Sequence, residues 1–249
     1  MDHDSRQAPI LFISDLHLDP ARPAIVRLFL EFLAKARHEA QALYILGDLF
    51  EAWIGDDAAR DDEPALAGLR AFAASGRPLY VMRGNRDFLL GEDFERITGA
   101  RLLPEPTVIR IDGERVLLLH GDSLCTDDHE YQKFRAMVRD PAWQRQFLAL
   151  SIAERVQQAR AARGESRQRN SALDDHLMDV NQAAVLEATG GHGVRTLVHG
   201  HTHRPAIHQL EVHGQPARRI VLGDWYEQGS VLRWADREAE LRVLAPGEG

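Results

Sequence analysis

Cysteine is almost absent from this chain of 249 residues, with Cys125 as its single example. No disulfide can form within the chain, which excludes the small disulfide-stapled scaffolds of secreted proteins. The length suits one large domain whose core needs no such staples. A lone thiol fits a reducing compartment.

Long apolar runs are also absent. No run approaches the roughly 20 residues that a membrane-spanning helix needs. The first residues, MDHDSRQAP, are polar, and no apolar segment of a secretory signal follows them. We therefore expect a cytoplasmic protein.

An excess of positive charge is lacking as well, since the formal net charge is -8. This balance disfavours non-specific binding of nucleic acid. The window 131–170 is the exception: it holds nine Lys or Arg and three acids, so it carries +6 and the rest of the chain -14. Two interpretations stay open, a solvated helix face or a basic flap that faces an anionic substrate or a membrane surface.

Short apolar runs of strand length occur along the chain, and a stretch of helical spacing (23–37) separates the first two. The runs lie at 10–14, 42–46, 78–82, 116–120 and 196–199, with later β-like runs at 207–212, 219–222 and 230–234. The early pattern predicts βαβ units, and the late runs predict added antiparallel strands. With no internal repeat and no linker, we predict a single α/β domain over residues 1–249.

The segment 129–190 lacks a convincing strand. Its apolar residues have the spacing of amphipathic helices: Phe134, Met137, Val138, Phe147, Leu148, Ile152 and Val156. It is either a pair of ordinary packing helices or a helical insertion that forms a lid over a site. Its length and local charge favour the lid.

Five short segments place polar residues directly after an apolar run: SDLH (14–17), GD (47–48), GNRD (84–87), HGD (120–122) and GHTH (200–203). Ligands bind at the carboxyl ends of strands in open α/β sheets, so these loops can converge on one point. A glycine in four of the five segments permits tight turns and close approach of the backbone. The candidate metal ligands are Asp15, His17, Asp48, Asn85, His120, His201 and His203.

This mixture of nitrogen and oxygen donors suits Mn, Fe, Zn or Ni more than Ca or Mg. Two ions need a bridging carboxylate, and Asp48 is the obvious bridge because it is the lone acid of its segment. Two ions about 4 Å apart would activate water and hold both oxygens of an in-line phosphoryl displacement. Each motif alone is weak, but the ordered set of five is very unlikely by chance.

The set resembles the calcineurin-like metallophosphoesterases, with their D-x-H, GD, GNH, H and GHxH segments. The resemblance implies a four-layer sandwich of two mixed β-sheets flanked by helices. It implies that Asp15, His17, Asp48 and His203 hold one ion, and that Asp48, Asn85, His120 and His201 hold the other. His199 falls outside the GHxH segment, which suggests a supporting or packing role.

Longer strings resemble the UDP-2,3-diacylglucosamine hydrolases: EAWIGDD (51–57), HGDSLCTDD (120–128), MDVN (178–181) and LGDWYEQGS (222–230). This resemblance implies attack of metal-activated water on the α-phosphorus of UDP-2,3-diacylglucosamine, giving UMP and 2,3-diacylglucosamine 1-phosphate for lipid A. It implies two divalent ions, Mn²⁺ expected, and a peripheral protein on the cytoplasmic face of the inner membrane.

The same resemblance implies substrate contacts, with Asn85, Arg86 and His201 at the metal centre and with three residues further along: Asp128, Ser166 and Asn170. A lysine that the family often carries falls near Leu173 here, so its role passes to Arg167 or Arg169 or is absent. We expect a monomer that binds a nucleotide-diphospho lipid and no nucleic acid.

Arg86 supports a diphosphate substrate on physical grounds. The broader family has histidine at this position, which can protonate a leaving alkoxide, whereas arginine keeps its proton near neutral pH. A phosphate leaves as a stable anion and gains from a fixed positive charge instead. We therefore predict that Arg86, together with Asp48 and Asn85, is catalytic.

Two other functions remain open. The first is another phosphoesterase of the same fold, such as a cyclic nucleotide phosphodiesterase or a protein phosphatase; Arg86 and the long insertion speak against it. The second is a non-catalytic scaffold, which would be expected to lose ligands, whereas every ligand position here is filled.

Overall fold

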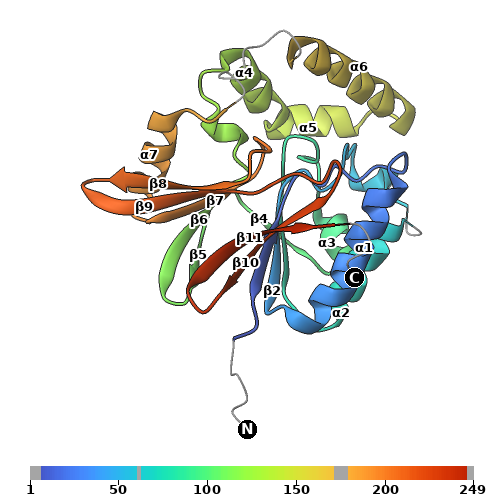
Figure 1. Ribbon diagram of the computed structural model, residues 1–249. Helices are drawn as coiled ribbons and strands as arrows, with labels where there is room; N and C mark the ends of the chain where they lie inside the picture. Colours follow the sequence, from blue (N-terminus) through green and yellow to red (C-terminus); the bar gives the residue numbers. More distant parts are fainter. Residues whose placement is uncertain (1–6, 61–62, 171–178, 246–249) are drawn as a thin grey trace.

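Two mixed β-sheets pack face to face at the centre of the computed structural model (Figure 1), which describes residues 7–60, 63–170 and 179–245, without the side chains of 165–170. The first sheet has six strands, in the spatial order β11 (Glu238–Leu244), β10 (Gly229–Ala235), β1 (Ile10–Ile13), β2 (Ala42–Leu46), β3 (Leu79–Met82) and β4 (Arg101–Leu103). Strands β1 to β4 run parallel, and β10 lies antiparallel to β1.

The second sheet has five strands, in the order β5 (Thr107–Ile111), β6 (Glu114–Leu118), β7 (Thr196–His199), β9 (Gln215–Val221) and β8 (Ala206–Val212). Strands β6, β7 and β9 are parallel, while β5 and β8 pair antiparallel at the two edges. Both sheets therefore present several parallel carboxyl ends at one side of the molecule.

Helices cover the outer faces of both sheets. The first sheet carries α1 (Pro23–Glu39), α2 (Pro64–Ala74) and α3 (Glu92–Thr98), and the second carries α7 (Gln182–Gly191). Alternate residues of a strand point to opposite faces. Accordingly Ile13 packs against the outer helices, while Phe12 packs between the sheets with Trp234. A third cluster joins Val185 of α7 to Leu197 of the second sheet. The layers thus run helix, sheet, sheet, helix.

Three further helices lie above the edge where the parallel strands end (Figure 1): α4 (His129–Val138), α5 (Pro141–Leu148) and α6 (Ile152–Asn170). Two of them begin at an aspartate whose side chain accepts backbone N–H groups, a capping arrangement that satisfies donors the helix leaves open. Asp128 accepts from Tyr131 N, and Asp140 accepts from Ala142 N and Trp143 N. No helix among the described residues is both long and apolar enough to cross a membrane.

Each apolar run of the sequence forms a strand, and the predicted helix 23–37 is α1. Segment 129–190 contains no strand in its described part, as predicted, but its helices have two locations. Helices α4 to α6 lie over the strand ends, whereas α7 packs on the second sheet. The sequence pattern did not predict α2, α3 or the edge strands β4, β5 and β11.

Candidate metal centre

All seven predicted ligands meet at the carboxyl ends of five parallel strands. Asp15 and His17 follow β1, Asp48 follows β2 and Asn85 follows β3. In the second sheet His120 follows β6, and the pair His201 and His203 follows β7. The packing of the two sheets brings these loops together, because their parallel strands end on the same side.

The backbone at this point is strained. Nine non-glycine residues in the described chain have a positive φ, and five of them are candidate ligands: Asp15, His17, Asp48, His201 and His203. Such conformations cost of order 1–3 kcal/mol each and persist where the surroundings enforce them, often at functional sites.

Two glycines allow the close approach that the loops require. A Cβ at Gly84 would lie 2.1 Å from Asp48 Oδ1, and one at Gly200 would lie 2.3 Å from Asp15 Oδ2. Any side chain at either position would therefore displace a carboxylate of the centre.

Four histidines form two pairs on either side of Asp48. The rings of His17 and His203 lie 5.3 Å apart, with their Nε2 atoms 3.4 Å from each other. The rings of His120 and His201 lie 5.1 Å apart. Asp48 directs Oδ2 to His17 Nε2 at 3.8 Å and Oδ1 to His120 Nε2 at 3.7 Å. This arrangement suits a carboxylate shared by two cations.

The second histidine pair is closed by Asn85. Its Oδ1 lies 2.9 Å from His120 Nε2 and 3.0 Å from His201 Nδ1. The other nitrogen of His120, Nδ1, lies 2.9 Å from the carbonyl oxygen of Leu46 and donates to it. This bond fixes the His120 ring so that Nε2 faces the centre.

The residues present fit divalent cations. Asp15 Oδ1 is buried without a hydrogen bond and lies 3.3 Å from His203 Nε2. Burial alone would lower the pKa of His120, but the negative charges of Asp48, Asp122 and Asp15 raise it to about 9. A proton thus collects where carboxylates concentrate negative potential, and a cation would replace it. In each of two groups, the carboxylate and imidazole ligand atoms lie within 4.8 Å of one another. The first group is Asp15, His17 and His203, and the second is Asp15, Asp48 and His120.

Asp87 and Asp122 support the loops around the centre. Asp87 accepts from Gly84 N at 2.7 Å and from Leu49 N at 2.8 Å, so it joins the loops after β3 and β2. Burial and the charge of Asp48 raise the pKa of Asp87 to about 6. Asp122 accepts from Tyr131 Oη at 2.8 Å and pairs with Arg135 at 2.9 Å.

Arg86 is anchored through its backbone. Its N–H donates to Asp48 Oδ1 at 2.8 Å, and its carbonyl accepts from Trp53 N at 3.1 Å. Its side-chain Nε is buried and lacks a hydrogen-bond partner among the described residues. The positive charge of Arg86 is among the causes that lower the pKa of Glu51, so the guanidinium lies near the carboxylate that contacts His17.

Residues near the centre that the sequence reasoning missed include Glu51 and Tyr226. Glu51 Oε2 lies 3.1 Å from His17 Nδ1. Tyr226 stacks on the ring of His17, with centroids 5.3 Å apart and planes at 8°. Both residues occur in the longer strings quoted above, so their place in those strings was the available signal.

Much of the predicted basic window is neutralised inside the molecule. Arg135 pairs with Glu105 at 2.7 Å as well as with Asp122. Arg155 is only 1 % exposed and pairs with Asp57, and Arg163 pairs with Glu51. Arg155 is therefore not part of a solvated face, and the ion pairs of all three arginines hold α4 and α6 to the domain.

A groove of about 610 Å³ opens between α6 and the loop after β2. Its apolar lining includes Leu18, Phe50, Trp53, Ile54, Ile152 and Val156. Glu51 and Arg163 also line it, so it reaches the neighbourhood of His17. Phe134 and Met137 add exposed apolar surface on α4, whereas Phe147 is 8 % exposed and packs in the core.

Of the three further residues expected to contact the substrate, one lies away from the seven candidate ligands and two have side chains outside the described part of the chain. Asp128 is half-buried and caps α4, with Oδ1 2.9 Å from Tyr131 N. The side chains of Ser166 and Asn170 lie outside the described residues, as do those of Arg167 and Arg169 and the position Leu173. His199 is buried, and burial lowers its pKa to about 3, which fits a packing role.

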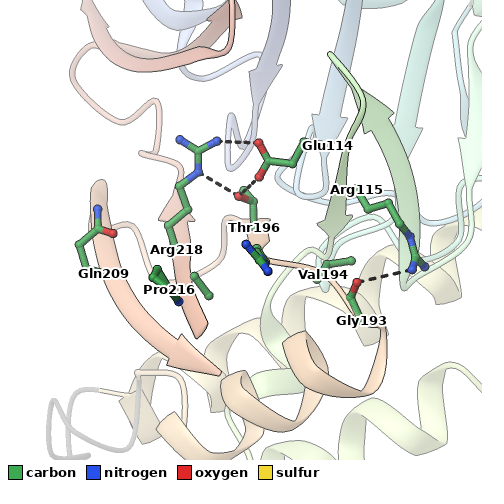
Figure 2. A pocket seen from close by; sticks show the side chains of 10 residues that line it. Glu114, Arg115, Gly193, Val194, Thr196, Gln209, Pro216 and Arg218 are labelled. Atoms are coloured by element: carbon green, nitrogen blue, oxygen red, sulfur yellow. Dashed lines mark hydrogen bonds and ion pairs between the residues drawn. The ribbon is translucent and has the colours of Figure 1, made fainter. Parts of the chain in front are cut away.

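A second cavity of about 580 Å³ lies at the opposite, amino-terminal ends of β6, β7 and β9 (Figure 2). Within it Arg218 donates to Thr196 Oγ1 at 2.9 Å and pairs with Glu114 at 3.2 Å. These contacts join the starts of three neighbouring strands. The cavity contains none of the seven candidate ligands and stands apart from the metal centre.

Comparison with known proteins defines the class of this chain. A family model described as calcineurin-like phosphoesterase matches residues 8–205. The chain belongs to this family, which confirms the fold predicted from the motifs.

Relatives at high identity define the group within the family. A protein of Stenotrophomonas maltophilia strain R551-3, named UDP-2,3-diacylglucosamine hydrolase, is 56 % identical over 90 % of this chain and 93 % of its own length. A protein of the same name from Xanthomonas axonopodis pv. citri strain 306 is 54 % identical over 94 % of this chain and 98 % of its own. The resemblance predicted from the longer strings is confirmed over nearly the whole chain.

Proposed function

We propose that this chain hydrolyses UDP-2,3-diacylglucosamine to UMP and 2,3-diacylglucosamine 1-phosphate, a reaction of lipid A biosynthesis. The observation that carries the proposal is the placement of Arg86, a fixed cation whose backbone is held by Asp48 at the metal centre. The relatives bearing that enzyme's name support the same substrate.

The centre would hold two divalent ions, with Mn²⁺ as the expected metal. Asp15, His17, Asp48 and His203 would hold one, and Asp48, Asn85, His120 and His201 the other. When bound, such ions lower the pKa of water and neutralise charge on a phosphoryl group. The donor set of imidazole, carboxylate and amide oxygen suits Mn²⁺ better than Mg²⁺ or Ca²⁺.

The chain's own residues orient the substrate. Water oxygen adds to the α-phosphorus, and the bond from that phosphorus to the bridging oxygen breaks, so the β-phosphate leaves on the lipid sugar. Arg86 stabilises the charge that develops on the leaving phosphate. Asn85 and His201 would contact phosphoryl oxygens, and the 3.0 Å between Asn85 Oδ1 and His201 Nδ1 supports a shared role at the centre.

The helical insertion 129–190 would supply lipid recognition. Ile152 and Val156 line the groove beside the centre, and each buried acyl methylene would contribute about 0.8 kcal/mol. Asp128, Ser166 and Asn170 would contact the polar part of the substrate. Helix α7 would be a structural part of this segment, because Val185 packs on the second sheet.

A lipid substrate would be met at a membrane surface. We propose a monomer bound peripherally to the cytoplasmic face of the inner membrane. Phe134 and Met137 on α4 are 38 % and 46 % exposed and would contact the lipid surface.

Phosphorus NMR in ¹⁸O-labelled water tests the reaction. Turnover of UDP-2,3-diacylglucosamine should yield UMP carrying the label and unlabelled 2,3-diacylglucosamine 1-phosphate, because the attack is at the α-phosphorus. Label in the lipid product would refute the site of attack. Hydrolysis of cyclic nucleotides with no diphosphate cleavage would refute the substrate.

A further inference from the structure

Glu51 lies between the metal centre and helix α6. Its side chain is 16 % exposed, and its Oε2 lies 3.1 Å from His17 Nδ1. Its other oxygen, Oε1, pairs with Arg163 of α6, and the Arg163 guanidinium also donates to the Glu51 carbonyl. One carboxylate therefore contacts a candidate metal ligand on one side and the overlying helix on the other.

The two nitrogens of the His17 ring face opposite ways, Nε2 toward the metal centre and Nδ1 toward Glu51. Nε2 faces Asp48 and His203, so it is the nitrogen that a cation would take. Nδ1 then keeps its proton and requires an acceptor, the role that carboxylates often play behind metal-bound histidines. Glu51 is at the right distance, although the contact is not aligned as a hydrogen bond in this structure.

Helix α6 is held to the domain chiefly by charge. Among its described side chains, 152–164, Arg155 is the only buried one. Arg155 donates to the carbonyl of Ile54 at 2.7 Å and to Asp57 Oδ1 at 2.7 Å. Arg163 holds Glu51 two helical turns further on. Both arginines thus bind the loop 51–57 that follows β2. Only Arg163 binds it at Glu51, the residue that contacts His17.

We propose that Glu51 is a positioning residue that couples the His17 imidazole to helix α6, so that metal binding and docking of α6 stabilise each other. The inference rests on the proposed metal-dependent function. Coupling of this kind is reciprocal: whatever α6 docking adds to metal affinity, bound metal adds to α6 docking. Because α6 forms one wall of the apolar groove, an occupied centre also favours a formed groove.

Three variants separate this role from general loosening of the helix. Glu51→Gln keeps the shape of the side chain but removes its charge. Arg163→Gln removes the link from α6 to Glu51. Arg155→Gln is the matched control, because it loosens α6 through Asp57 and Ile54 without touching the partner of His17.

The experiment measures Mn²⁺ affinity by calorimetry and hydrogen exchange of α6 with and without Mn²⁺. In the parent protein Mn²⁺ should slow exchange in α6. Glu51→Gln and Arg163→Gln should bind Mn²⁺ about 10–100-fold more weakly, the usual cost of losing a partner behind a metal ligand, and should lose this metal-dependent protection. Arg155→Gln should exchange faster in both states but keep its metal-dependent protection, and it should weaken Mn²⁺ binding less than Arg163→Gln does, because Arg163 still pairs with Glu51.

Other results overturn the inference. Exchange in α6 that is insensitive to Mn²⁺ in a parent protein that binds the ion would refute the coupling and leave the proposed function standing. Equal weakening of Mn²⁺ binding in Arg155→Gln and Arg163→Gln would show loosening without a role for Glu51. A parent protein that binds no divalent ion would refute the proposed function itself, and the coupling with it.

Discussion

Replacing Arg86 with alanine should lower kcat sharply while sparing the metal centre. The substitution leaves both backbone contacts in place, namely Arg86 N to Asp48 Oδ1 at 2.8 Å and Trp53 N to the Arg86 carbonyl at 3.1 Å. Asp48 therefore keeps its position, and the arrangement of the candidate ligands is undisturbed. Only the guanidinium is lost, and it is not among those ligands.

The size of the effect follows from the role. Losing one preorganised donor to a developing anion usually costs about 10²–10³ in kcat, or about 2.7–4 kcal/mol. Because Arg86 Nε is buried and has no hydrogen-bond partner among the described residues, its removal breaks no other hydrogen bond of that atom. The loss in kcat should therefore reflect the substrate interaction and little loss of stability.

Two further substitutions separate charge from shape. Arg86→Lys should recover only part of the rate, since an ammonium lacks the planar fork that grips phosphate. Arg86→His should be poor on the diphosphate, yet should improve hydrolysis of simple aryl or alkyl phosphodiesters, whose leaving oxygens can use a proton.

The assay is kcat on UDP-2,3-diacylglucosamine and on an aryl phosphodiester, with bound metal quantified for every variant. Arg83→Ala is a suitable control, because Arg83 belongs to the same loop but its Nε donates to the Leu90 carbonyl at 2.6 Å. It should affect stability more than kcat. Full diphosphatase activity in Arg86→Ala would refute the reasoning, and with it the physical argument for a diphosphate substrate.

Four other outcomes are expected. Asp48→Asn should weaken binding of both ions and abolish turnover; two tightly held ions with near-parental activity, measured by elemental analysis and rate, would contradict a bridging role. His120 holds a proton up to a pKa of about 9 in the metal-free protein, so Mn²⁺ binding near pH 7 should release it, and affinity should fall about tenfold per pH unit on acidification; calorimetry that detects no proton release would contradict this. Burial and nearby carboxylates raise the pKa of Cys125 to about 12, so the thiol should stay protonated and resist a disulfide reagent at pH 8 until the protein is unfolded; rapid labelling of the folded protein would contradict it. Ile152→Ser and Met137→Ser should raise KM for the diacylated substrate and spare small phosphodiesters, whereas equal losses on both substrates would point to a packing role.

Strand ends and candidate ligands were readable from sequence for one physical reason. A strand buried on both faces is apolar throughout, so the first polar residues after it mark its end. The run before Asp15 has Phe12 facing one core and Ile13 the other. The missed strands β4, β5 and β11 lie at sheet edges and carry charged residues such as Arg101 and Glu240, so their apolar signal is weak.

Only the tertiary structure decided which acidic groups the arginines of the basic window pair with. Sequence counts showed a basic window, but only the fold shows that Arg155 is buried against Asp57 and that Arg163 meets Glu51. Phe147 is similar: its helical spacing predicted an apolar face, and only packing shows that the residue lies in the core rather than on a lipid-facing surface. The partners of Arg155 and Arg163 lie 98 and 112 positions away in the chain, beyond the reach of any local pattern.

The sequence by itself determined eight of the eleven strands, the ligand types and the chemistry they suit, because these depend on residues that are neighbours in the chain. The tertiary structure alone decided that Asp48 lies between two histidine pairs and that Glu51 joins His17 to α6. Those contacts depend on two sheets packing so that their parallel strands end together, and on a helix fastened across that edge by arginines. Distances between residues remote in sequence are set by that packing, and no periodicity in the chain encodes them.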